Sequence, residues 1–93
     1  MPPVHYDPID SIEIKAPQHS SDASYLVRYG QVDWDQDGQN VQTAIYVLMK
    51  YGEDIKYRRV AHILTTSNTP DEPTDLEKVV HAIQTLKIRN NIR

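Results

Sequence analysis

The sequence predicts an α+β domain in which four β-strands form a mostly antiparallel meander and one C-terminal helix packs on one face of the sheet, in the order ββββα. Two observations lead to this fold class. Between residues 25 and 66, three segments rich in β-branched and aromatic residues are separated by the turn signals Asp37-Gly38 and Gly52-Glu53-Asp54. After residue 73, a capping motif precedes residues with the spacing of an amphipathic helix.

The four strands are expected near residues 11–16, 25–34, 41–51 and 56–65, with an extended arm at 1–8 and loops at 17–24 and 67–73. The first strand alternates strictly, with Ile12 and Ile14 on one side and Glu13 and Lys15 on the other, and Pro17 ends it. The expected strand at 41–51 also fits helical spacing. Its density of β-branched and aromatic residues nevertheless favours a strand.

The helix is expected to begin after Thr74. Glu77 lies three residues later, so the two can form a capping box. The apolar residues that follow recur at helical spacing: Leu76, Val79, Val80, Ile83 and Leu86. This pattern predicts an amphipathic helix of about 14 residues.

Composition limits the classes of function that fit. The 93 residues suit a single domain, 1–93, because one hydrophobic core can grow well beyond this length. The net charge of -3 is too small to indicate general attraction to nucleic acid, and the absence of cysteine excludes disulfides and thiolate metal sites. With no secretory signal pattern and no apolar run that could span a bilayer, we expect a cytoplasmic protein without membrane contact.

The two faces of the predicted sheet follow from the register of the first hairpin. A turn centred on Asp37-Gly38 pairs Trp34 with Val41 and Arg28 with Val47. Both faces are then substantially apolar, whereas a single helix covers only one of them. We assign the helix to the face that carries Trp34, Ile45 and Val60. Arg28 fits this assignment least, because its charged head must reach solvent between elements.

The opposite face would expose four tyrosines and an arginine: Tyr25, Tyr29, Tyr46, Tyr57 and Arg59. A large aromatic surface usually marks an interaction site, and Tyr and Arg are enriched at interface hot spots. We therefore expect a small non-enzymatic interaction or regulatory module that binds a protein partner or forms a homodimer, through this face or an exposed strand edge. In the alternative, the N-terminal arm and the 67–73 loop cover the face as ordinary core.

Binding of single-stranded nucleic acid by Tyr and Arg side chains is the alternative function. The segment Lys56-Tyr57-Arg58-Arg59 combines positive charge with an aromatic residue, as such sites do. In a strand, however, Arg58 and Arg59 point to opposite faces and do not form one patch.

Other motifs indicate chemistry only weakly. Asp33–Gly38 matches the D-x-D-x-D-G opening of a calcium loop, but the twelfth position, which should be a bidentate Glu, is Ala44. The histidines at positions 5, 19, 62 and 81 lack metal-ligand spacing. His19 lies beside Ser20, Ser21 and Asp22 without an identifiable orienting group or oxyanion donor. We predict no catalytic residue, no metal site and no cofactor.

Overall fold

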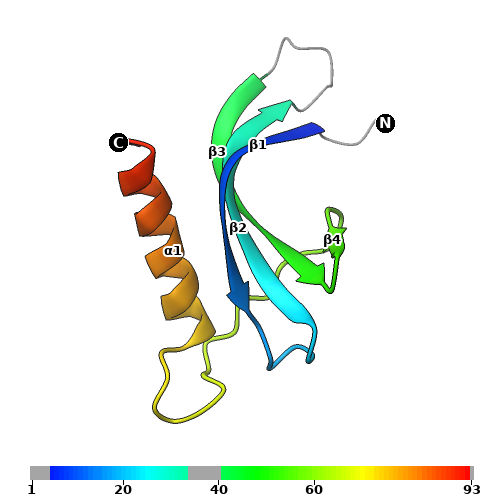
Figure 1. Ribbon diagram of the computed structural model, residues 1–93, viewed down its shortest axis with the longest axis vertical. Helices are drawn as coiled ribbons and strands as arrows, with labels where there is room; N and C mark the ends of the chain where they lie inside the picture. The colour runs from blue at the N-terminus through cyan, green and yellow to red at the C-terminus, as the bar shows by residue number, and fades with distance from the viewer. Residues whose placement is uncertain (1–4, 34–40, 93) are drawn as a thin grey trace.

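The computed structural model describes residues 5–33 and 41–92, which form a four-stranded sheet and one helix (Figure 1). In chain order the elements are β1 (His5–Lys15), β2 (Ala23–Asp33), β3 (Val41–Tyr51), β4 (Asp54–Lys56) and α1 (Asp75–Arg89). The sheet order is β1-β2-β3-β4, and each strand is antiparallel to the next. The predicted α+β fold and its order ββββα are confirmed, and β3 is a strand rather than a helix.

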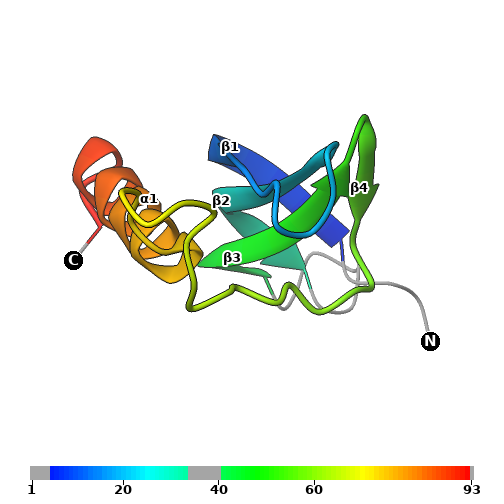
Figure 2. The same ribbon diagram turned by 90° about the horizontal axis from the view of Figure 1, so that it is seen from below.

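The sheet is bent, and its two faces have different neighbours. The helix α1 lies along the convex side, where it packs on β1 and β2. The short strand β4 turns away on the concave side, as both views show (Figures 1 and 2). Within the described residues, no helix covers the concave side.

Strand β1 is longer than the sequence predicts, because it begins at His5, within the predicted arm. This first half pairs with β2 through its backbone, which does not require alternating apolar side chains. The register shifts between Pro8 and Asp10, where a bulge interrupts the ladder. Gly30 of β2 lies opposite Pro8, and a Cβ atom at Gly30 would stand 2.5 Å from the carbonyl oxygen of Asp7.

The register of β2 and β3 differs by one residue from the predicted one. Arg28 pairs with Tyr46 rather than with Val47. The predicted turn, Asp37-Gly38, and Trp34 lie outside the described residues. A shift of one residue moves every β3 side chain to the other face, so the face beneath α1 combines Tyr25, Val27 and Tyr29 with Ile45, Val47 and Met49. The helix was predicted on the face of β2 that carries Arg28. This placement is wrong, because α1 covers the face that carries Tyr25, Val27 and Tyr29.

The predicted strand over residues 56–65 is also wrong, since β4 ends at Lys56. The carbonyls of Leu64 and Thr66 accept hydrogen bonds from the first residues of α1, at 2.9 and 3.1 Å, and not from a neighbouring strand. Ala61 and Ile63 still pack against the core at alternate positions, which explains why the segment has a strand-like sequence.

The helix begins where the sequence predicts. The Thr74 side chain accepts from the backbone N–H of Glu77, and the Glu77 side chain accepts from the backbone N–H of Thr74, which completes the capping box. The buried stripe is rotated from the predicted one and consists of Asp75, Val79, Ala82 and Leu86. Leu76 and Val80 are 41% and 43% exposed. In the described part of the chain, no helix is both long and apolar enough to cross a membrane.

The main core lies between α1 and the convex side of the sheet. Its buried members are Ala16, Ala23, Tyr25, Val27, Met49, Val79, Ala82 and Leu86. On the concave side Leu26, Val32 and Leu48 are also buried, although α1 lies on the other side of the sheet. Both faces are therefore apolar, as the sequence indicates.

Candidate interaction surfaces

The five residues of the predicted interaction face are Tyr25, Tyr29, Tyr46, Tyr57 and Arg59, and the structure does not bring them together. The two β2 tyrosines lie beneath α1, Tyr25 fully buried and Tyr29 half-buried. Tyr46 and Tyr57 lie on the concave side. The exposed Arg59 guanidinium lies 6.0 Å from the centre of the Tyr51 ring. The register shift separates Tyr46 from Tyr25 and Tyr29, because it places β3 side chains opposite to their predicted face.

Tyr25 belongs to a buried hydrogen-bond network that joins the sheet to the start of α1. Its hydroxyl donates to Oδ2 of Asp75 at 2.6 Å and accepts from the N–H of Leu64 at 3.3 Å. Asp75 is 1% exposed, and its Oδ1 accepts from Nε2 of Gln18 at 3.2 Å. Burial and the Asp75 carboxylate raise the pKa of Tyr25 to about 12. The phenol is therefore a neutral donor, and we call this arrangement, together with His19, the Tyr25–Asp75 network.

His19 completes the network. Its Nε2 lies 3.1 Å from the hydroxyl of Tyr25 and 2.8 Å from the carbonyl oxygen of His62. Because the Tyr25 proton points to the buried carboxylate at the shorter distance, both of these oxygens act as acceptors, so Nε2 carries a proton. Ser20 donates to Asp22 at 2.6 Å. These contacts stabilise the β1–β2 loop and do not pair a histidine base with a serine nucleophile.

A second cluster lies on the concave side, and we call its four residues, Tyr6, Arg28, Tyr46 and Tyr57, the concave cluster. The Tyr6 ring centre lies 4.8 Å from that of Tyr46 and 5.6 Å from that of Tyr57. Nη1 of Arg28 donates to the Tyr57 hydroxyl at 3.3 Å. Three of these residues were identified from the sequence: Tyr46 and Tyr57 as part of the predicted interaction face, and Arg28 as the residue that least fitted the predicted helix placement. The prediction missed Tyr6, which was assigned to the arm.

The polar groups of the concave cluster are poorly matched. Arg28 is only 8% exposed, and none of the ion pairs among the described residues includes it. Its Nε and the hydroxyl of Tyr46 are buried without a hydrogen-bond partner in the described structure. Burial raises the pKa of Tyr46, and the nearby Arg28 guanidinium opposes this shift only in part. Such groups are destabilising unless a further partner satisfies them.

Strand β3 has a long free edge. Strand β4 pairs only with residues 49–51 of β3. Residues 41–48, VQTAIYVL, have no strand beside them on that side among the described residues, and we call them the β3 edge. They contain no charged residue, proline or glycine. Edge strands usually carry such residues or a bulge, because an unprotected edge pairs readily with another strand.

The other free edge of the sheet, β1, has these protective features. It contains Pro8 and a bulge, and its carboxylates are Asp7, Asp10 and Glu13. Glu13 accepts from Lys50 at 2.9 Å, which fixes one of these charges beside the sheet. The two edges therefore differ, and only the β3 edge suits pairing with another strand.

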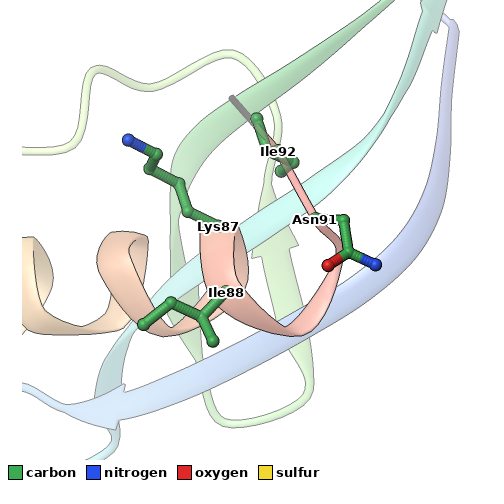
Figure 3. A pocket seen from close by; sticks show the side chains of 4 residues that line it. All are labelled: Lys87, Ile88, Asn91 and Ile92. Carbon is green, nitrogen blue, oxygen red and sulfur yellow. The ribbon is translucent and has the colours of Figure 1, made fainter.

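Two open depressions lie at the end of α1. The larger, of about 640 Å³, is lined by Lys87, Ile88, Asn91 and Ile92, whose side chains point in different directions (Figure 3). Small-molecule sites have polar groups that converge in a deep pocket, so we assign no ligand here. The second, of about 500 Å³, extends from this helix end to Tyr29, Thr43, Ala44 and Ile45, and therefore borders the β3 edge.

Within residues 5–33 and 41–92, no group of three or more His, Asp or Glu side chains could hold a metal ion. The calcium-loop pattern at Asp33–Gly38, only a weak indication in the sequence, lies outside the described residues apart from Asp33. Comparisons of the chain with protein-family models, curated proteins and solved structures found no match. Function must therefore be inferred from the β3 edge and the concave cluster themselves.

Proposed function

We propose that the protein is a small non-enzymatic interaction module that forms a homodimer by antiparallel pairing of the β3 edges of two copies. The supporting observation is the uncharged β3 edge, which has no strand beside it in the described structure. When a strand is added to a sheet, backbone hydrogen bonds provide affinity and side-chain pockets provide specificity. A second β3 edge would supply the missing backbone partners for residues 41–48.

A second copy of the chain fits this edge because the edge is complementary to itself. In a two-fold antiparallel pair within residues 41–48, every residue faces another uncharged residue. The depression beside Thr43 and Ile45 leaves space for side chains of the added strand. The same pairing through β1 would bring the carboxylates of Asp7, Asp10 and Glu13 toward their copies, which is unfavourable.

Binding of single-stranded nucleic acid has less support. Sheets that bind nucleic acid present open aromatic faces for stacking and exposed cations for phosphate contact. Here the Tyr6 ring contacts both Tyr46 and Tyr57, and Arg28 is buried. Oligonucleotide binding that weakens steeply with added salt would favour this alternative.

Light scattering after size exclusion, over micromolar to millimolar protein, tests the dimer. The mass should rise from that of one 10.7 kDa chain toward twice that value. Thr43→Lys places a charge on an exposed position of the β3 edge and should raise the dimer Kd at least about tenfold. Thr43→Val, which retains an uncharged β-branched side chain, should leave dimerisation intact.

Ile9→Lys is the matched control, because it adds the same charge to an exposed position on the protected β1 edge. It should not change the dimer Kd. A mass of one chain at every concentration would contradict self-association. A dimer with the same Kd in Thr43→Lys and Ile9→Lys would show that the interface lies elsewhere.

A further inference from the structure

Arg28 occupies an unusual position for a cation. It lies in the middle of β2, directly opposite Tyr46 of β3 and Ser11 of β1, and is 8% exposed. A buried guanidinium normally has a carboxylate partner, because removing an unpaired charge from water is strongly unfavourable. The ion pairs among the described residues include Arg89, Lys50, Lys56 and Lys78 but not Arg28.

Part of the hydrogen-bonding capacity of Arg28 and Tyr46 is unused in the described structure. Nη1 donates a hydrogen bond to the hydroxyl of Tyr57 at 3.3 Å, near the upper limit for such bonds. Nε of Arg28 and the hydroxyl of Tyr46 have no partner in the described structure. Burial lowers the pKa of Arg28, but the hydroxyls of Tyr57 and Tyr46 raise it, and on balance it lies above its ordinary value. The guanidinium therefore remains charged.

We propose that Arg28 and Tyr46 form a binding site for a single carboxylate group, and that the carboxylate displaces the hydroxyl of Tyr57. The planar guanidinium offers two parallel N–H donors to the two oxygens of a carboxylate, a geometry that gives both strength and orientation. The Tyr46 hydroxyl lies on the adjacent strand of the same face and supplies a further donor. The Tyr57 hydroxyl now occupies one of the oxygen positions.

Access to the site depends on Tyr57. This residue directly follows the three-residue strand β4 and is 47% exposed. Its ring is held by the Tyr6 ring, at 5.6 Å, and by the single long bond to Arg28. Tyr57 follows Lys56, the last residue of the β3–β4 ladder, so rotation of its side chain breaks no backbone hydrogen bond of the sheet.

The local charge favours a monoanion such as a carboxylate over a phosphate dianion. Lys50 of β3 and Lys56 of β4 are already paired, Lys50 with Glu13 at 2.9 Å and Lys56 with Asp54 at 2.5 Å. Arg28 therefore provides one uncompensated positive charge, which a single carboxylate neutralises.

Sodium acetate is the probe that tests this site, with sodium chloride at equal ionic strength as reference and sodium phosphate as a second arm. The ¹H–¹⁵N signal of Arg28 Nε should shift with acetate and saturate, and Tm should rise with acetate but not with chloride. Acetate binding should weaken at least about tenfold in Tyr46→Phe, which removes one donor and keeps the ring. Tyr57→Phe removes the competing acceptor and should bind acetate more tightly.

Arg28→Met should abolish the response, and Arg58→Met, at an exposed arginine two residues beyond β4, is the matched control that should leave it unchanged. If Arg28→Met does not fold, Tyr46→Phe and Tyr57→Phe decide the question.

An Arg28 signal that moves equally with acetate and chloride, or an acetate response unaffected by Tyr46→Phe, would overturn the proposal. Tighter binding of phosphate than of acetate would overturn the assignment to a carboxylate. None of these readouts depends on the proposed dimer, because they are measured in the Thr43→Lys background at a protein concentration where that variant is a monomer.

Discussion

Replacing Tyr25 with Phe removes one hydroxyl from the core and leaves the ring in place. The variant leaves Oδ2 of Asp75 without its 2.6 Å donor. It also leaves the N–H of Leu64, at 3.3 Å, and Nε2 of His19, at 3.1 Å, without that acceptor. Because Asp75 is 1% exposed, water cannot easily replace the lost donor.

The expected loss follows from these contacts. A hydrogen bond to a charged group contributes about 1.5–3 kcal/mol, and a buried N–H left without a partner adds about 1 kcal/mol. We therefore expect the free energy of unfolding to fall by about 2–4 kcal/mol. For a domain of this size, Tm should fall by roughly 10–25 °C.

Urea unfolding followed by circular dichroism measures this change. The control is Tyr29→Phe, a half-buried tyrosine on the same face with no described hydrogen bond of its hydroxyl, where the loss should stay below about 0.5 kcal/mol. Equal losses in the two variants would refute the view that the Tyr25–Asp75 network stabilises the attachment of α1.

The same hydroxyl gives a dependence on pH with a defined sign. The pKa of Tyr25 rises from 10.0 to about 12 on folding, so the folded state holds its proton more tightly than the unfolded state. The resulting stability is fully present below pH 10 and is lost as the pH rises toward 12, by about 3 kcal/mol. Tyr25→Phe should lack this alkaline loss, whereas Tyr29→Phe should retain it.

Two further substitutions test the sheet and its attachment to the helix. Gly30→Ala places a Cβ atom 2.5 Å from the carbonyl oxygen of Asp7, so β1 must move, and urea unfolding should show a loss of about 1–3 kcal/mol. The side chains of Arg89 and Asn90 lower the pKa of Asp10, so the stability they give is present above the ordinary carboxyl pKa and lost as the pH falls through the lowered one. Asp10→Asn should therefore be less stable at neutral pH and lose less stability on acidification; an acid titration as steep as that of the unmodified protein would contradict this.

The sequence predicted the elements wherever local signals decided them. The capping box of Thr74 and Glu77 fixed the start of α1, and branched and aromatic residues fixed β3 as a strand. The predicted register of β2 and β3 was wrong, because the seven residues between the two strands allow more than one hairpin. A shift of one residue then reversed the side on which the β3 side chains lie.

The candidate surfaces could be predicted only in part. Arg28 was recognisable as a lone charge in an apolar strand, but its neighbour Tyr6 belongs to a segment whose pairing the sequence did not reveal. The β3 edge could not be predicted because it depends on where β4 stops pairing. That point is set by the path of residues 57–74 toward α1, which is a property of the whole chain.

The sheet and the helix differ in how far apart in the chain their contacts lie. Each strand pairs with the next one along the chain, so the meander requires only short loops to close. The start of α1, in contrast, is bound by Tyr25, 50 residues earlier. A growing or refolding chain would thus assemble its hairpins first and dock its helix last. Before α1 docks, the apolar convex side of the sheet would be exposed to solvent, and the chain would be most prone to aggregate.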